Sequence, residues 1–401
     1  MPHAPDSTAG SPRARRAALA AGAGLILIAA FCAAQAPATS GDAPAPGSAP
    51  AANAVPAPDA SAIPESALTP ALPAETSPPP RPPGPPIALV LPLGSPDYVR
   101  PAEAVRDGFL AAAAAAGAAS SVRVIPHAAG GVLAAFDEAR RDGARVVVGP
   151  LVRDDLRALV ASDQPLPVTI ALNQLDDAST LPPRLYTFAL AIESDARTIA
   201  RRMRDEQVAN VAVVSGDSPL MRRFAQAFVA EWILAGGNPP QTHALVATQD
   251  GLRAMRRDLG KSAIDAIVLA VDGQDAALVK TYAPRVTTWA SGQINQRLDA
   301  SALRDLDEVR FVDVSWIVAP DAAAFAKLPR PDYASAALER LYALGLDAYR
   351  VARAFVAAPP DRLSFDGATG HVELSDARQI AREGRVAMFR EGAIVPLDPA
   401  R

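Results

Sequence analysis

Few residues of this chain have the types and spacing that catalysis or metal binding requires. The region after residue 86 contains three histidines, His127, His243 and His371, and they are too far apart in sequence to share one helical turn as metal ligands. The adjacent carboxylates at 154–155 and 176–177 would point about 100° apart on a helix, so they suit helix starts and turns better than a shared substrate. The sequence also shows no nucleophile elbow, phosphate loop or dinucleotide-binding glycine pattern. We therefore expect no enzymatic activity, no cofactor and no metal.

The region after residue 86 has the sequence pattern of alternating strands and helices, and these elements would position its polar side chains. The segment IALVL at 87–91 is apolar throughout, as in a strand covered on both faces, and the helix after it has Val105, Phe109 and Ala112 on one stripe. Ser218-Pro219 has the residue types of a helix start, a capping hydroxyl followed by proline. This alternation predicts a doubly wound parallel α/β architecture, in which ligands sit beyond the carboxyl ends of the strands. The other predicted strands are 122–126, 146–149, 168–172, 186–190, 211–214, 266–271, 287–290 and 311–314.

Residues 1–34 predict an export signal or a membrane anchor. Three arginines at 13–16 precede an uninterrupted run of apolar or small residues at 17–34. Cys32 is the chain's only cysteine, which excludes a disulfide within the chain, and its place at the end of the run makes it a candidate for lipid attachment. Cleavage before Gln35 and retention of the run as a membrane helix are the alternatives. Each of them predicts export from the cytoplasm, as a lipid-anchored protein, as a protein held by an uncleaved helix, or as a released protein.

Residues 35–86 predict a disordered tether. Proline, alanine, serine and glycine dominate them, and 19 of the chain's 39 prolines lie before residue 87. A fully extended polyproline-II chain of this length would span about 150 Å, at roughly 3.1 Å per residue. A separation on the order of 100 Å between an anchor and the folded region is therefore accessible.

The charge of the chain argues against nucleic acid as a partner. The formal net charge is −4, and both signs are spread along the sequence. Arginines do cluster at 201–204, 222–223 and 253–257. Solvated helix faces are the ordinary reason for such clusters, and a docking surface for an acidic partner or an anionic wall polymer is the alternative.

Several segments resemble, in order, the C-terminal domain of the LppC/LpoA family. Besides IALVLPL and AVRDGFLAA near the start, they are VVGPL at 147–151, ALNQ at 171–174, ASGQI at 290–294, VRFVD at 309–313 and LYALGLDAY at 341–349. GATG at 367–370, followed by HVEL, is similar to a turn and strand near the end of that domain. The resemblance covers residues 87 to about 398. The better-known members carry a helical-repeat domain where this chain has the proline-rich tether.

The resemblance implies a two-lobed type I periplasmic-binding-protein fold at 87–401, with two doubly wound parallel sheets joined by a hinge. Lobe 1 would comprise about 87–187 and 292–362, and lobe 2 about 188–291 and 363–401. Polar strand-end loops would then bound a cleft that could hold a small polar ligand or a peptidoglycan fragment. Helix capping and turn formation are the alternative roles of the same residues. The candidate cleft residues are Ser95, Asp97, Tyr98, Asn173, Gln174, Asp217, Ser218, Asp272, Ser291 and Gln293.

The resemblance also implies a function, because members of this family are outer-membrane lipoproteins that activate class A penicillin-binding proteins. On that basis we expect a non-enzymatic envelope protein that regulates peptidoglycan synthesis, with a class A penicillin-binding protein as its partner and a membrane attachment through its N-terminal segment. A periplasmic solute-binding protein of an ABC-type transporter, with an amino acid or similar small ligand, is the alternative. Fold alone does not separate the two.

Overall fold

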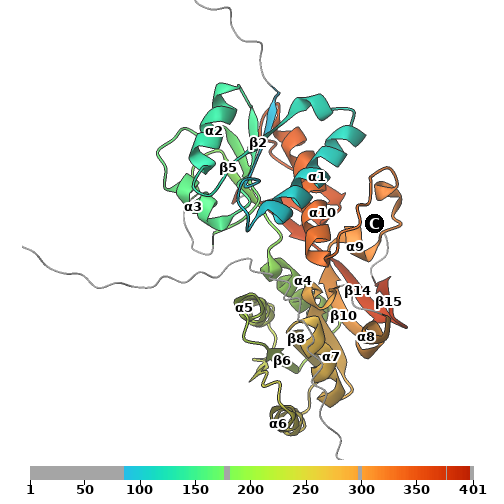
Figure 1. Ribbon diagram of the computed structural model, residues 1–401. Helices are drawn as coiled ribbons and strands as arrows, with labels where there is room; N and C mark the ends of the chain where they lie inside the picture. The colour runs from blue at the N-terminus through green and yellow to red at the C-terminus, as the bar shows by residue number, and fades with distance from the viewer. Residues whose placement is uncertain (1–84, 176–180, 297–299, 376, 398–401) are drawn as a thin grey trace, which may run out of the picture. The chain divides into compact units, whose positions relative to one another are not determined.

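The computed structural model describes residues 85–175, 181–296, 300–375 and 377–397. The predicted signal segment with Cys32, all but the last two residues of the tether, and the carboxylates at 176–177 lie outside these residues. The described residues form two lobes, each built on one mainly parallel sheet with helices on both faces (Figure 1). The predicted α/β architecture of two doubly wound sheets is therefore confirmed.

The sheet of the first lobe has, in the described residues, eight strands in the order β11-β12-β13-β5-β4-β3-β1-β2. The strands β1 to β5 and β13 all run in the same direction. At one end of the sheet, β11, β12 and β13 form an antiparallel ribbon. Their bounds are β1 Ile87–Leu91, β2 Val122–Pro126, β3 Val146–Val148, β4 Val168–Ala171, β5 Leu185–Phe188, β11 Ser364–Gly367, β12 Gly370–Leu374 and β13 Gln379–Glu383.

The second lobe repeats this plan. In the described residues its seven strands have the order β15-β14-β10-β9-β8-β6-β7, with β14 and β15 added antiparallel to the parallel part. Their bounds are β6 Val211–Ser215, β7 Gln241–Ala244, β8 Ala266–Ala270, β9 Thr287–Ser291, β10 Val309–Asp313, β14 Arg385–Arg390 and β15 Ala393–Pro396.

Apolar helix faces cover the sheets on both sides. In the first lobe α1 and α10 bury one face, and α2 and α3 bury the other. In the second lobe α4 and α5 lie on one face, and α6 and α7 lie on the other. The helices are α1 Val99–Ala115, α2 Val132–Arg141, α3 Arg153–Val160, α4 Ile192–Asp205, α5 Pro219–Leu234, α6 Gln249–Leu259, α7 Gly273–Tyr282, α8 Ala300–Asp305, α9 Ser315–Val318 and α10 Ala336–Phe355.

The structure corrects the expected lobe boundaries. We expected 292–362 to return to the first lobe and 363–401 to complete the second. Instead β10 pairs with β9 in the second sheet, whereas β13 pairs with β5 and so brings β11 and β12 into the first sheet. Only Gly384 separates β13 from β14, so one extended stretch of chain contributes to both sheets. The chain therefore passes between the lobes after Phe188, after Asp313 and at Gly384.

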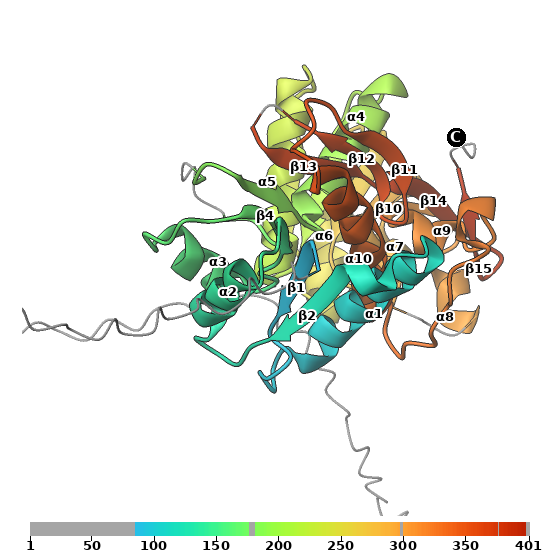
Figure 2. The same cartoon turned by 90° about the horizontal axis from the view of Figure 1, so that it is seen from above.

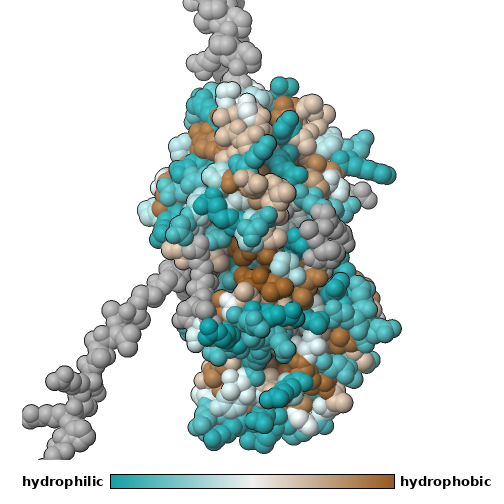
Figure 3. Space-filling model, turned by 90° about the vertical axis from the view of Figure 1, so that its right-hand side faces the viewer, coloured by the Kyte–Doolittle hydropathy of each residue, from teal (hydrophilic) through white to brown (hydrophobic). Residues whose placement is uncertain are grey.

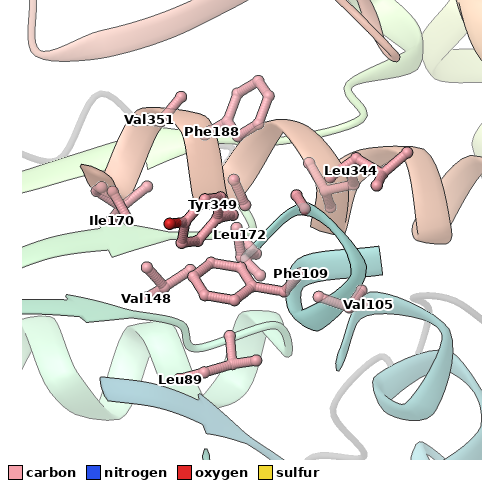
Figure 4. Packing of buried hydrophobic residues seen from close by; sticks show 14 of the residues in the cluster. Leu89, Val105, Phe109, Val148, Ile170, Leu172, Phe188, Leu344, Tyr349 and Val351 are labelled. Carbon is pink, nitrogen blue, oxygen red and sulfur yellow. The ribbon is translucent and has the colours of Figure 1, made fainter. Parts of the chain in front are cut away.

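The core of the first lobe lies between the sheet and two helices that are distant in sequence. Leu89, Val148 and Ile170 point from neighbouring strands toward Phe109 of α1 and Tyr349 of α10 (Figure 4). The two aromatic rings meet edge to face, with centroids 5.4 Å apart. This is a favourable geometry for an aromatic pair and adds to the free energy gained by burying both rings. Figure 1 shows α10 running beside α1.

The close approach of α1 and α10 depends on glycine. A Cβ at Gly345 would lie 2.2 Å from the carbonyl oxygen of Val105 and 2.8 Å from the amide nitrogen of Phe109. Because these are backbone atoms, Gly345→Ala should force the helices apart and lower the free energy of unfolding by about 3 kcal/mol or more. Gly216→Ala is the matched control, since its Cβ would meet nothing closer than 3.8 Å. Urea unfolding measures both, and equal stability of the two variants would contradict this account.

Both polar and apolar side chains lie on the face shown in Figure 3. The polar side chains surround a band of apolar side chains that crosses the middle of this face. Among the described residues, the exposed large apolar side chains are Ile233 and Leu234 at the end of α5, Val246 in a loop and Leu278 on α7. Scattered exposure of this kind is ordinary in a folded domain whose core is complete.

Candidate functional site

The three chain crossings define the lobe junction: β5 to α4, β10 to α9, and β13 to β14. The last crossing is tight, because a Cβ at Gly384 would lie 2.7 Å from a methyl group of Val312 and 2.9 Å from the carbonyl oxygen of Asp313. Two ion pairs are buried at this junction, and each joins a residue of one lobe to a residue of the other. The junction is therefore held by charge pairing as well as by chain connectivity.

The first ion pair joins Arg340 of α10 to Asp313 at the end of β10. Arg340 donates through Nε and Nη2 to the two carboxylate oxygens, both at 2.8 Å. Its Nη2 also donates to the carbonyl oxygens of Gly292, at 2.6 Å, and Asn295, at 3.2 Å. Only 8% of Arg340 and 2% of Asp313 is exposed. One first-lobe side chain thus binds the ends of two second-lobe strands with the bidentate geometry that favours arginine.

The second ion pair joins Arg382 of β13 to Asp195 of α4, with Nη2 to Oδ2 at 3.0 Å. Burial raises the pKa of Asp195, and the neighbouring Arg382 opposes that shift. This pair is less complete than the first. Among the described residues, Nε and Nη1 of Arg382 and Oδ1 of Asp195 are buried without a hydrogen-bond partner.

A cavity of about 620 Å³ lies beside this second pair, between the β12–β13 ribbon and α4. We call it the groove. In the sheet register, Ile380 pairs with Phe188 and faces α10, so its neighbours Gln379 and Ala381 face the other side of the sheet. The helices α2 and α3 cover that side over β1 to β5 but leave the ribbon open. Figure 2 shows α4 beside β13 at this end of the sheet.

The two walls of the groove are both polar. The strand wall consists of His371, Glu373, Gln379, Ala381, Arg382 and Glu383. The helix wall consists of Glu193, Ser194, Arg197, Thr198 and Arg201, and Gln174 and Leu175 close one end. Such a lining can hold a charged or hydrogen-bonding ligand. In the part of the chain that the structure describes, no three histidine, cysteine or carboxylate side chains are grouped as metal ligands.

Of the predicted cleft residues, Gln174 lines the groove, and its Oε1 accepts a 3.3 Å hydrogen bond from Gln379. Its neighbour Asn173 instead supports the loop. The side chain of Asn173 donates to the carbonyl oxygen of Leu151 at 2.8 Å and accepts from the amide of Gln174 at 2.9 Å. The adjacent amides therefore differ in role.

The structure does not bring the other predicted cleft residues to the groove. Three of them cap helices, which was the alternative role expected for them: Ser218 accepts from Met221 at 3.1 Å, Asp272 from Asp275 at 3.0 Å, and Ser291 from Gln293 at 3.3 Å. The turn after β1 contains Ser95, which is buried, Asp97, which is exposed, and Tyr98, which precedes α1. Asp217 is exposed before α5, and Gln293 lies in a short 3-10 helix. A ligand role for these residues stays a prediction.

The histidines lie in or at the end of strands and far apart. His127 follows β2 and contacts the carbonyl oxygen of Ala128, His243 lies in β7, and His371 pairs with Asp366 at 2.8 Å. The carboxylates at 154–155 are in the first turn of α3, as predicted. Among the described helices, none is long and apolar enough to cross a bilayer.

Sequence reasoning missed the residues of the lobe junction and most of the groove. The wrong lobe boundaries placed β12 and β13 in the other lobe, so their contact with α4 was not foreseen. A signal did exist for Asp195, because this carboxylate lies in the apolar stripe of α4 with Ile192 and Ile199. Buried carboxylates require partners, so an arginine on a neighbouring element could have been sought.

Curated relatives match the chain at 24–25% identity. "Penicillin-binding protein activator LpoA" of Edwardsiella ictaluri is 24% identical over 309 residues, which cover 65% of this chain and 45% of the relative. The protein of the same name from Yersinia pseudotuberculosis is 25% identical over 401 residues, covering 78% of this chain and 61% of the relative. The chain thus matches about half of the length of these relatives.

Solved structures share the fold. A structure from Chromobacterium violaceum, described as a "putative branched-chain amino acid ABC transporter", is 31% identical with a TM-score of 0.67 and covers 75% of this chain and 99% of that one. The LpoA C-domain of Haemophilus influenzae, described as "a regulator of PBP1A", is 23% identical with a TM-score of 0.67 and covers 78% of this chain and 99% of that one. The type I periplasmic-binding-protein fold is therefore confirmed.

A family model matches nearly the whole described region. It is described as "LppC putative lipoprotein" and matches residues 82–244 and 240–392. These residues include both lobes, the lobe junction and the groove. The chain belongs to the LppC family.

Proposed function

We propose that this chain is a non-enzymatic envelope protein that regulates peptidoglycan synthesis by binding and activating a class A penicillin-binding protein. Family membership carries this proposal. The curated relatives are named penicillin-binding protein activators, and the Haemophilus influenzae domain of the same fold is described as a regulator of PBP1A. The family model matches the two lobes that the chain contains.

The lobe junction supports a scaffold rather than a transport receptor. A receptor that traps a solute must change the angle between its lobes, and hinge residues must absorb that change. Here Arg340 joins α10 to Asp313 and to two carbonyl groups of the second lobe. Separating these groups would leave a buried charge without its partner, which costs several kcal/mol. Fixed lobes suit a surface that another protein recognises.

The family description names a lipoprotein, which fits a place in the cell envelope. We place attachment in residues 1–34, through a lipid at Cys32 or through a retained apolar helix. The mass of the N-terminal peptide of the mature protein distinguishes these two forms from cleavage before Gln35. That measurement also decides whether the chain is held at a membrane.

The proposal is tested by adding the full chain to a purified class A penicillin-binding protein from the same organism and measuring glycan polymerisation and peptide crosslinking. We expect the synthase rate to rise in a saturable manner, while the chain alone produces no change in peptidoglycan. Heat-unfolded chain at the same concentration is the control. An unchanged synthase rate at saturating chain would refute the proposal.

A solute-binding role is the second candidate, favoured by the similarity to the Chromobacterium violaceum structure. The groove does not suit a branched aliphatic side chain, because Leu175 and Ala381 are the apolar residues in its lining. We therefore expect leucine, isoleucine and valine to leave the melting temperature unchanged at millimolar concentration. Tight binding to the native state would raise it by mass action, and a clear rise would favour the transport role.

A further inference from the structure

The groove has charged side chains on both walls, and each wall comes from a different lobe. The helix wall from α4 presents Arg197 and Arg201, and the strand wall from β12 and β13 presents Glu373 and Glu383. In the sheet register, His371 is opposite Glu383, and Glu373 is opposite Ala381, so these side chains share one face of the ribbon. Glu193 and Arg382, the charges of the other sign on each wall, are paired with Arg223 and Asp195. Arg197 therefore lies across the groove from Glu373 and Glu383.

Several of these charged groups have unused binding capacity. Arg201 pairs with Glu231, and Glu193 pairs with Arg223, so both are occupied by α5. Arg197, by contrast, has only a 3.4 Å contact to the hydroxyl of Ser194. Within the described residues, the side chains of Glu373 and Glu383 have no hydrogen bond or ion pair.

Arg382 is an independent sign that the groove favours an anionic ligand group. It lines the groove and is 7% exposed, yet two of its guanidinium nitrogens have no hydrogen-bond partner in the described part of the chain. A buried guanidinium normally satisfies its donors, because unpaired buried donors are costly. An anion at the adjacent end of the groove would lower that cost.

We propose that the groove binds a short peptide that carries both a free carboxylate and a free ammonium group. Arg197 would bind the carboxylate with its planar pair of donors, and the positive charge of Arg382 would also favour that carboxylate. Glu373 and Glu383 would accept hydrogen bonds from the ammonium group. The amide side chains of Gln174 and Gln379 are placed to bind the peptide groups between them. A volume of about 620 Å³ lies within the range of small-ligand sites.

The chemistry of the groove specifies the two charges, whereas the source of the peptide rests on the proposed function. A regulator of peptidoglycan synthesis works beside stem peptides, which carry carboxylates and free amines on one short chain. A released stem peptide would report the state of the wall to the regulator.

Calorimetric titration of the full chain tests the proposal, with the peptidoglycan stem tripeptide, its N-acetylated form, its amidated form and leucine as probes. We expect the free tripeptide to bind, and each blocked form to bind about tenfold more weakly, because each loses a charge-assisted interaction. Affinity should fall as salt is raised, since both walls are open to solvent. Leucine should produce no heat of binding.

Variants assign each charge to its wall. Arg197→Gln should weaken binding of the free tripeptide about tenfold and leave binding of the amidated form unchanged. Glu383→Gln should weaken binding of the free tripeptide and leave binding of the N-acetylated form unchanged. Arg253→Gln is the matched control, because Arg253 is an exposed arginine of α6 that is not part of the groove. Equal thermal stability of the three variants shows that folding is intact.

Two outcomes overturn the proposal: no heat of binding with millimolar tripeptide, or equal weakening of all probes by Arg197→Gln. The synthase assay is run without added peptide, so that activation of the synthase and binding of tripeptide in the groove are tested separately. If the chain binds tripeptide but does not activate the synthase, the groove assignment stands and the proposed function fails. If the chain activates the synthase and Arg197→Gln binds tripeptide as the original does, the groove assignment fails alone.

Discussion

Replacing Arg340 with methionine should lower the free energy of unfolding by about 3–5 kcal/mol, because it leaves the buried carboxylate of Asp313 without its partner. The change also removes the donors to the carbonyl groups of Gly292 and Asn295. Since Arg340 belongs to the first lobe and its acceptors to the second, the lobes should also unfold less cooperatively. Calorimetry would then resolve two transitions where the original chain has one.

Two further variants separate charge from packing. Arg353→Met changes an exposed arginine of the same helix and should alter stability by less than about 0.5 kcal/mol. The double variant Arg340→Met with Asp313→Leu removes both charges, and it should recover a large part of the stability lost in Arg340→Met alone. If Arg340→Met unfolds at the same urea concentration as the original chain, the lobe junction does not depend on this ion pair.

The parallel parts of both sheets were predictable because their strands are buried on both faces. Runs such as residues 87–91 and 146–148 are apolar throughout, and turns or helix starts bound them, so few other structures could accommodate them. The helix start at Ser218 was equally plain, because the residue types needed for a cap occur there in the right order. Local chemistry alone fixes these elements.

The antiparallel strands were not predictable in the same way. The strands β11 and β13 alternate more and less exposed positions over only a few residues. Which sheet such strands join depends on long-range pairing with β5 or β10, which leaves no local mark. The expected lobe boundaries failed for that reason, and with them the contact between the ribbon and α4.

The groove was only partly predictable for the same reason. Gln174 follows a recognisable strand, so its place at a strand end was clear, and it does line the groove. Arg197 lies on the polar face of α4, where arginines are ordinarily solvated. Arg197 differs from a solvated surface arginine because the ribbon of the other lobe places Glu373 and Glu383 across the groove from it.

Asp347 should be as important to the groove as Arg340 is to the lobe junction, because it positions the turn from which β12 begins. This buried carboxylate of α10 accepts from the amide of Ala368 at 2.9 Å, and from the amide and hydroxyl of Thr369, each at 2.7 Å. In Asp347→Asn, the side-chain NH2 group would replace one of the two carboxylate oxygens that accept these hydrogen bonds. At least one of the N–H or O–H donors would then lack an acceptor. Leaving buried donors unsatisfied costs about 1–3 kcal/mol each, so we expect a loss of about 2–4 kcal/mol in the free energy of unfolding.

The same change should weaken tripeptide binding without touching the groove, because β12 carries His371 and Glu373 of the strand wall. Asp361→Asn is the matched control, because Asp361 is exposed in the loop before β11 and does not line the groove. Surface substitutions of this kind change stability by less than about 0.5 kcal/mol. Urea unfolding and hydrogen exchange at residues 367–374 measure both variants. If Asp347→Asn leaves exchange in this segment as slow as in the original chain, Asp347 does not hold the ribbon, and β12 must be fixed by its pairing with β11 and β13.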